Sequence, residues 1–254
     1  MKRRSPSSAR KSGLRPSESG GRPNRAVPEA PEHPAVKTLR LLAARYGNDP
    51  WNWHTQQTPF QVLIGTVLSQ RTRDEKTDAT ARALFSRYPS PEALAVAKVE
   101  EIEELIRAVN YYRTKAKRIH DICTILLARY NGRAPDTIAE LMKLPGVGRK
   151  TASCVMVYGF RRPALPVDTH VHRIANRIGL VRTRFPEETE RALCEVLPER
   201  HLMTCNELMV KHGQAICRPR GPKCEECPVA ESCAYASKLR LKTSLKQVAK
   251  KPAS

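Results

Sequence analysis

Apolar residues recur at helical spacing over most of the chain between residues 35 and 212. The clearest run is Phe60, Leu63, Ile64, Val67 and Leu68, which follows the i, i+3, i+4, i+7 pattern of one helix face. Before it stand Thr58, Pro59 and Gln61, in the positions of an N-cap, a first helical residue and the second half of a capping box. The pattern therefore predicts a core helix from Pro59 to about Ser69.

The same reasoning predicts further helices over residues 35–46, 74–88, 99–109, 114–130, 137–142, 169–178, 186–197 and 202–212, with a short one opening at Ser90-Pro91 and another leading out from Lys150. Asp74 and Asp168 are expected as N-caps, while Asn131-Gly132, Gly179 and Gly213 are expected to end helices. No stretch alternates between apolar and polar residues for long enough to predict a strand. The expected fold class is all-α.

Both ends of the chain lack this periodicity and are basic. Residues 1–34 contain eight Lys and Arg but only three Glu, and this composition predicts a disordered basic tail, with a transit peptide as the alternative. Residues 238–254 are predicted to form a second basic tail. Over the whole chain, 45 Lys and Arg against 25 Asp and Glu give a formal charge of +20, which favours a polyanionic partner without identifying it. No run of 18 apolar residues occurs, so no membrane-spanning segment is expected.

Two of the predicted helices are joined by the turn Leu144-Pro145-Gly146-Val147-Gly148-Arg149-Lys150-Thr151. Glycines permit positive φ and leave the peptide N–H groups uncovered, directly before a helix start that favours an anion. Lys150 falls in the first turn of the outgoing helix, where the positive helix end disfavours its protonated form, as an amine nucleophile requires. Taken alone, such a turn also fits a tight helical corner with a solvated lysine.

Four cysteines lie close together near the C-terminus: Cys217, then six residues, Cys224, two residues, Cys227, five residues and Cys233. A loop broken by proline and glycine can fold these thiolates around a metal centre. A four-cysteine zinc site and a [4Fe–4S] cluster both fit, and the spacing alone does not decide between them; a disulfide pair is the third alternative. The remaining cysteines fall on apolar helix faces and are predicted to be buried: Cys123, Cys154, Cys194 and Cys205.

Three motifs in order, Leu144–Thr151, Val167-Asp168-Thr169-His170 and the cysteine spacing, closely resemble those of the helix-hairpin-helix DNA glycosylases of the endonuclease III family. The resemblance spans about residues 35–237. It implies two helical lobes with a DNA cleft between them: a helical barrel over residues 52–162 that carries the hairpin, and an iron–sulfur lobe formed by 35–51 and 163–237. It also implies a [4Fe–4S] cluster on Cys217, Cys224, Cys227 and Cys233.

The resemblance assigns roles to single residues. Lys150 falls at the family's catalytic lysine, which forms a Schiff base at C1′, and Asp168 matches its catalytic carboxylate. For Asp168, a purely structural role as an N-cap is physically just as plausible. Gly146, Val147, Gly148 and Arg149 would grip a phosphate.

The family fills the gap left by an extruded nucleotide from the segment Leu68–Thr72 of this chain. Gln70 and Arg71 are the candidates, although relatives usually carry glutamine where Arg71 aligns. The alternative is that both are ordinary polar residues at a helix end. Tyr111 and Tyr112 are expected to pack in the core or to stack near the pocket, and His170 to make a structural hydrogen bond.

The expected function is base excision repair by a DNA glycosylase with AP lyase activity that removes oxidised pyrimidines. Relatives without a lysine at this position use water and stop at base removal, and adenine-excising relatives carry an acidic residue that residues 59–73 lack. A mismatch-specific thymine or uracil glycosylase and a non-catalytic DNA-binding module are the alternatives. The expected partner is double-stranded DNA with damaged bases or abasic sites, bound by a monomer away from any membrane. The expected location is the cytoplasm and nucleoid of a prokaryote, or the nucleus or mitochondrion of a eukaryote.

Overall fold

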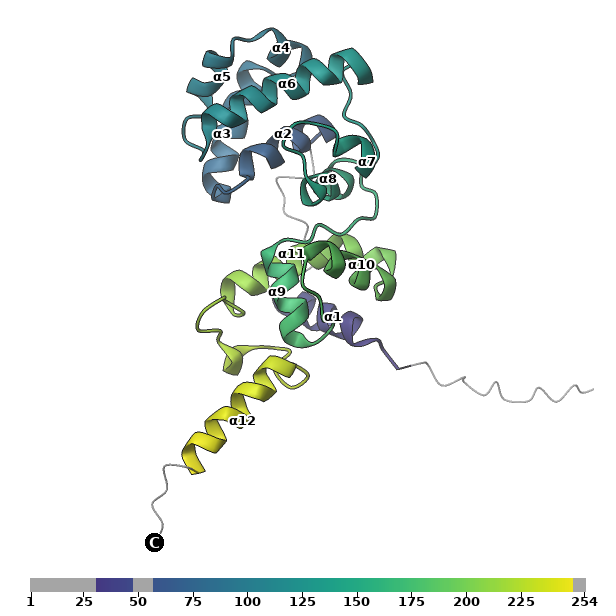
Figure 1. Ribbon diagram of the computed structural model, residues 1–254, viewed down its shortest axis with the longest axis vertical. Helices are drawn as coiled ribbons and strands as arrows, with labels where there is room; N and C mark the ends of the chain where they lie inside the picture. Colours follow the sequence, from purple (N-terminus) through teal and green to yellow (C-terminus); the bar gives the residue numbers. More distant parts are fainter. Residues whose placement is uncertain (1–30, 48–56, 249–254) are drawn as a thin grey trace, which may run out of the picture. The chain divides into compact units, whose positions relative to one another are not determined.

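The computed structural model describes residues 31–47 and 57–248, and within these ranges the chain is helical with no strand (Figure 1). The predicted all-α class is confirmed. The contacts divide the chain into Met1–Pro31 and Glu32–Ser254, and every helix among the described residues belongs to the second unit. No helix among the described residues combines the length and apolar character that a bilayer crossing requires.

The elements in chain order are α1 (Pro34–Tyr46), α2 (Pro59–Ser69), α3 (Asp74–Arg87), α4 (Pro91–Val96), α5 (Val99–Leu105), α6 (Tyr112–Tyr130), α7 (Ile138–Leu141), α8 (Arg149–Cys154), a π-helical turn η2 (Val155–Gly159), α9 (Thr169–Ile178), α10 (Pro186–Val196), α11 (Glu199–Ala215), a 3₁₀ turn η3 (Cys224–Glu226) and α12 (Ala234–Val248).

Helix α2 lies at the centre of the first apolar core, which collects buried residues between Phe60 and Ala164. Its start has the predicted capping box, in which the Thr58 amide donates to Gln61 Oε1 (3.0 Å) and the Gln61 amide donates to Thr58 Oγ1 (3.2 Å). The backbone of η2 packs directly on this start, since a Cβ on Gly159 would lie 2.8 Å from Pro59 Cα. The close approach fixes the end of η2 against the first turn of α2.

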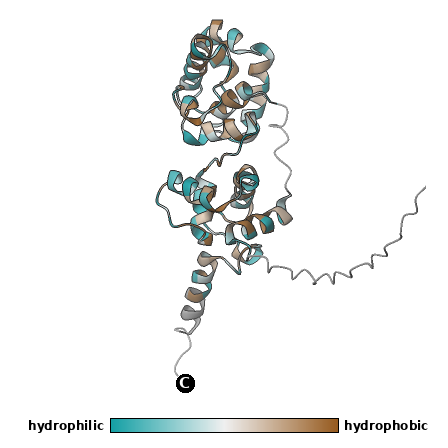
Figure 2. Cartoon of the chain, turned by 90° about the vertical axis from the view of Figure 1, so that its right-hand side faces the viewer, coloured by the Kyte–Doolittle hydropathy of each residue, from teal (hydrophilic) through white to brown (hydrophobic). Residues whose placement is uncertain are grey.

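A second apolar core is built from α1, α9, α10 and α11 together with the segment that carries the four C-terminal cysteines. Its largest fully buried side chains include Leu39 and Leu42 of α1. In Figure 2, the brown stretches along the helices mark the apolar residues. Asn206 of α11 donates to the Pro166 carbonyl (2.8 Å) and its Oδ1 accepts from Tyr158 Oη (3.3 Å), so buried hydrogen bonds connect α11 to η2 and to the segment before α9.

Several helix boundaries differ from those expected. Helix α5 ends at Leu105, not at residue 109, and α11 begins at Glu199, not at residue 202. Helix α11 also does not end at Gly213 but runs on to Ala215. A side chain at position 213 would overlap the ring of His170. Glycine is needed there for packing, not for a turn. Asp74 is the first residue of α3 and the N-cap position is Arg73, one residue earlier than expected. Beyond residue 237, where a tail was expected, α12 continues to Val248. Of the basic tail predicted over residues 1–34, residues 1–30 lie outside the described residues, and α1 already begins at Pro34.

Candidate functional site

The hairpin turn between α7 and α8 uses its two glycines differently. Gly146 has φ +73°, a left-handed conformation that favours glycine, and a Cβ there would lie 2.7 Å from Cδ of Arg118. Gly148 has an ordinary φ of −91°, and nothing lies within 4 Å of the Cβ it lacks. Its missing side chain therefore leaves the start of α8 open. Val147, between them, is buried and anchors the turn in the first core.

Lys150 is exposed in the first turn of α8, as the sequence predicted. Asp168 is the N-cap of α9, and its Oδ1 accepts hydrogen bonds from the amides of His170 (2.8 Å) and Val171 (2.9 Å). The expected capping role is confirmed. Because both bonds use the same oxygen, capping occupies only one of the two carboxylate oxygens.

Cys154, one turn after Lys150 on α8, lies close to both of these residues. Burial raises the pKa of its thiol, while the charge of Lys150 and a hydrogen bond with it act in the opposite direction, and the charge of Asp168 raises the pKa further. The thiol is thus within electrostatic reach of the amine and of the carboxylate. Lys150 and Asp168 are 18 positions apart in the sequence and lie at the starts of two different helices, yet both act on the buried thiol of Cys154.

The turn after α2 lies beside the hairpin. Gln70 Nε2 donates to the Gly146 carbonyl (2.9 Å) and to Thr151 Oγ1 (3.4 Å), so its amide is bound to the hairpin itself. Arg71 is exposed with φ +54°, and its guanidinium carbon lies 5.9 Å from the centroid of the Tyr111 ring. The two candidates for gap filling therefore differ. The Gln70 side chain is hydrogen-bonded to the hairpin, whereas the Arg71 side chain extends from the turn.

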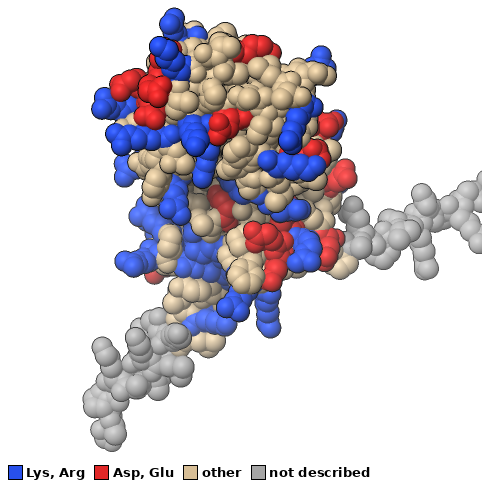
Figure 3. Space-filling model, turned by 45° about the horizontal axis from the view of Figure 1, so that its top comes forward, with Lys and Arg blue, Asp and Glu red and all other residues tan. Residues whose placement is uncertain are grey.

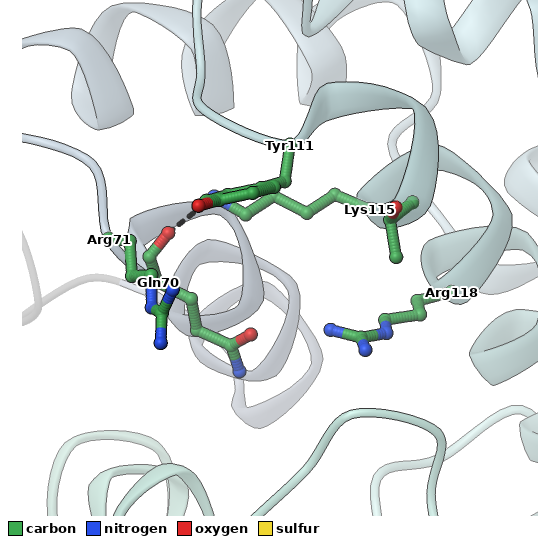
Figure 4. Close-up of a pocket in the computed structure, with 6 residues that line it drawn as sticks. Gln70, Arg71, Tyr111, Lys115 and Arg118 are labelled. Atoms are coloured by element: carbon green, nitrogen blue, oxygen red, sulfur yellow. Dashed lines mark hydrogen bonds between the residues drawn. The ribbon is translucent and has the colours of Figure 1, made fainter.

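A cavity of about 330 Å³ opens between this turn and helix α6 (Figure 4), and its lining is Gln70, Arg71, Tyr111, Thr114, Lys115 and Arg118. Lys115 is only 2% exposed and was not identified from the sequence. The available signal was its position on the buried stripe of α6, together with Ile119, Ile122 and Leu126. A lysine at such a position must find oxygen partners inside the protein.

Several other predicted residues have identifiable partners. The Arg149 Nε donates to Glu190 Oε2 of α10 (2.7 Å), so part of its guanidinium is committed to an ion pair. His170 Nδ1 lies 3.2 Å from Arg173 Nη2, in agreement with a structural hydrogen bond. Of the two placements expected for the tyrosines, core packing is found for Tyr112, which packs on the first core. It is wrong for Tyr111, which is 62% exposed and lines the cavity.

None of the eight cysteines, all of which lie in the described residues, forms a disulfide. Cys123, Cys154 and Cys205 are buried as predicted. The prediction is wrong for Cys194, which is exposed, because its side of α10 faces away from the apolar stripe that Leu193 and Leu197 turn towards the core.

The four C-terminal cysteines, which we call the cysteine quartet (Cys217, Cys224, Cys227 and Cys233), are close enough to act on one another. Burial raises the pKa of Cys227 and of Cys224, and the charges of the other quartet thiols raise it further. Arg177 Nη1 donates to Cys217 Sγ (3.6 Å), and His212 Nε2 lies 3.6 Å from Cys227 Sγ. In the described part of the chain, no three His, Cys, Asp or Glu side chains converge closely enough to hold a single metal ion. Four cysteine sulfurs near one another, with hydrogen-bond donors around them, suit a centre in which several positively charged metals offset the charge of bound thiolates.

One face of the protein is strongly basic. Figure 3 shows Lys and Arg side chains over much of one face, with Asp and Glu in smaller groups among them. A surface of this sign attracts a polyanion over a distance of about 10 Å at moderate ionic strength.

Comparison with known proteins gives consistent matches. A family profile described as HhH-GPD superfamily base excision DNA repair protein matches residues 64–199. Endonuclease III of Thermotoga maritima is 53% identical over 182 residues, which cover 72% of this chain and 85% of the relative. Endonuclease III of Synechocystis is 40% identical over 181 residues, which cover 71% of this chain and 83% of the relative. The solved structure of a trapped endonuclease III–DNA covalent intermediate, an estranged-adenine complex, has a TM-score of 0.74 at 33% identity and covers 80% of this chain and 96% of that chain.

Proposed function

The chain belongs to the HhH-GPD superfamily of base excision DNA repair proteins and, within it, to the endonuclease III family, and from this membership we propose how its residues carry out DNA glycosylase and AP lyase chemistry. The protein acts on double-stranded DNA with damaged bases. The observation that supports the assignment of the site is the approach of Lys150 and Asp168 to one buried thiol beside the hairpin. We propose the two apolar cores as the cores of the barrel lobe and of the iron–sulfur lobe.

Lys150 is the proposed nucleophile. In its neutral form, Nζ attacks C1′ of an extruded nucleotide; the Nζ–C1′ bond forms as the C1′–N bond to the base breaks, and the departing base takes up a proton. Opening of the sugar ring gives a Schiff base. Loss of a C2′ proton then breaks the C3′–O bond, which nicks the strand 3′ to the abasic site, and water releases the amine.

Asp168 is the proposed carboxylate partner. A negative charge beside C1′ stabilises the oxocarbenium-like charge that develops as the base leaves, and a carboxylate can accept the proton that the amine loses. Because Oδ1 is held by two backbone amides, the carboxyl group has a fixed orientation and needs no reorganisation during the reaction. One residue therefore supplies both the cap of α9 and the charge at the site.

The hairpin is the proposed phosphate grip. The open start of α8 at Gly148 exposes backbone N–H donors, which bind an anion without help from a side chain. Arg149 contributes from the same turn, with the part of its guanidinium that Glu190 does not occupy. Phosphate contacts of this kind fix the register of the protein on the duplex without reading its sequence.

Arg71 is the residue that we propose to fill the gap left by the extruded nucleotide. Gln70 has its amide committed to the Gly146 carbonyl, whereas Arg71 is exposed at the tip of the turn. Its planar guanidinium stacks on ring faces, so it can replace the lost base between its neighbours. Gln70 is proposed to brace the turn against the hairpin.

Oxidised pyrimidines are the proposed substrates, and a duplex comparison tests this. In borohydride trapping, the protein is expected to become covalently attached to DNA that carries thymine glycol opposite adenine. A mismatch glycosylase would instead process thymine or uracil opposite guanine and ignore thymine glycol, and a non-catalytic module would bind both duplexes without base loss. Either of the latter results would refute the substrate assignment.

We propose that the cysteine quartet holds a [4Fe–4S] cluster, which would tie η3 and the end of α11 together. The purified protein is expected to be brown, with about four iron atoms and four sulfides per chain. Cys227→Ser should lose the visible absorption and lower the melting temperature, because binding of the cluster is coupled to folding of the loop. Cys194→Ser, at an exposed cysteine outside the quartet, should retain both. A colourless protein containing one zinc would overturn the assignment.

The relatives from Thermotoga maritima and Synechocystis are bacterial. We accordingly propose that the protein works on the nucleoid in the cytoplasm of a prokaryotic cell.

A further inference from the structure

Lys115 of α6 has a complete set of hydrogen bonds to the end of α2. Its Nζ donates to the Leu68 carbonyl (2.7 Å), the Gln70 carbonyl (2.7 Å) and Thr72 Oγ1 (3.1 Å). Figure 4 shows the bond to Gln70 as a dashed line, with the lysine stem running along the cavity beneath Tyr111. An ammonium has three donors, and all three are used.

These three hydrogen bonds fit a protonated Lys115 and not the neutral amine that a second nucleophile would require. A neutral amine has two donors and a lone pair, so one of the three oxygens would lose its donor and face the lone pair. The arrangement therefore depends on the protonated form. Burial and the charge of Arg118 lower the pKa of Lys115 to about 8, which leaves it mostly charged at neutral pH.

The turn that Lys115 holds is one that the local sequence does not favour. Arg71 has φ +54°, a left-handed conformation that is unfavourable for a non-glycine residue. Asn110, just before α6, adds two bonds: its side-chain amide donates to the Arg71 carbonyl, and its backbone amide donates to Thr72 Oγ1 (3.2 Å). The strained turn is thus held from outside by the beginning of α6.

The same face of α6 also contacts the hairpin. Tyr111, Lys115 and Arg118 are spaced i, i+4 and i+7 and line one cavity. Arg118 lies against Gly146, where a Cβ would overlap its side chain, and Gln70 donates to the Gly146 carbonyl. Helix α6 therefore connects the turn that carries Arg71 to the turn proposed to grip the phosphate.

We propose that Lys115 is a positioning residue that holds the Gln70–Thr72 turn in register with the hairpin, so that Arg71 enters the duplex while the phosphate is bound. This inference rests on the proposed glycosylase function and on Arg71 as the gap-filling residue. Lys115 does not touch the reacting atoms. Its contribution is to the extrusion of an intact nucleotide, which requires a side chain in the gap, more than to the chemistry that follows.

The test separates extrusion from chemistry in the full-length protein. Single-turnover rates are measured for base excision from a thymine-glycol duplex and for β-elimination at a preformed abasic site, where no base has to be unstacked. Lys115→Met is expected to slow excision at least about tenfold, as for loss of hydrogen bonds to a charged group, while elimination changes by less than about threefold. A loss of folded protein would lower both rates equally.

Three further variants sharpen the comparison. Arg71→Ala removes the gap-filling side chain itself and should reproduce the imbalance between excision and elimination. Lys117→Met removes an exposed lysine from the same helix and should leave both rates unchanged. Thr72→Val removes the oxygen that accepts from Lys115 and from the Asn110 amide, while the two carbonyl acceptors of the ammonium remain. It should show the same imbalance in a milder form, and it decides the question if Lys115→Met does not fold.

A spectroscopic signal gives a second measurement. With 2-aminopurine next to the lesion, Lys115→Met should show a smaller fluorescence rise on binding than the wild type, and Lys115→Arg, which keeps the charge, should recover part of it. Equal loss of excision and elimination in a variant that retains the wild-type fold, or a wild-type ratio in both Lys115→Met and Thr72→Val, would overturn the proposal. If the wild-type protein itself does not excise thymine glycol, the proposed substrate fails instead, and the two failures are thereby distinguishable.

Discussion

Lys150→Ala is expected to abolish borohydride trapping and to lower the rate of strand nicking at an abasic site by at least about 10³-fold, because the step that forms the Schiff base loses its nucleophile. Lys150 is exposed in the first turn of α8, and its substitution removes no buried apolar group. The melting temperature should therefore stay within a few degrees of the wild-type value. The measurement is the amount of covalent protein–DNA adduct, alongside single-turnover nicking and binding to an uncleavable abasic analogue.

A matched control comes from the turn that follows α7 (Ile138–Leu141). Lys143 is also exposed, and its charge is paired with Glu140 within a single turn. Lys143→Ala removes one positive charge from the same region and should trap at the wild-type level. Binding of Lys150→Ala to the abasic analogue should remain within about tenfold of wild type, since the phosphate grip relies on backbone donors. Trapping that persists in Lys150→Ala would assign the nucleophile to another amine.

The local parts of the fold could be read from the sequence because they depend on a few adjacent residues. The capping box of Thr58 and Gln61, the left-handed Asn131-Gly132 end of α6 and the cap by Asp168 are all found as predicted. The two caps are bonds between a side chain and the backbone a few residues away, and the end of α6 is a left-handed turn closed by a backbone bond from Asn131 to the Leu126 carbonyl. All three are local, so sequence spacing alone specifies them. The hairpin belongs to the same class, because glycine at position 146 is fixed by its own φ.

The parts that could not be predicted depend on residues far apart in the chain. Gly213 looks like a helix stop until His170, 43 positions earlier in the numbering, is seen to occupy the space beside it. Arg149 looks like a free cation until Glu190 of α10 is placed against it. Lys115 stands 43 or more positions from the three oxygens it holds. In each case, the residue type is compatible with two environments, and only tertiary packing selects one.

Asp168→Asn separates the two roles of this carboxylate. Asparagine caps helices about as well as aspartate, and its Oδ1 can accept the same two amide hydrogen bonds, so the free energy of unfolding should change by less than about 1 kcal/mol. The negative charge beside C1′ is lost, however. We expect base excision to fall about 10²-fold or more, as when a preorganised charge or donor is removed from an active site. Thermal unfolding and single-turnover excision, measured on the same preparation, provide the two readouts.

Asp168→Ala completes the comparison, because alanine removes both the cap and the charge. It should cost about 1 kcal/mol of stability and lower excision as far as Asp168→Asn does. If activity instead followed the cap, Asp168→Asn would stay near the wild-type rate and only Asp168→Ala would lose it, which would reduce Asp168 to a structural residue. We expect both Asp168→Asn and Asp168→Ala to lose excision, because capping uses Oδ1 alone. The second carboxylate oxygen therefore remains available to the sugar.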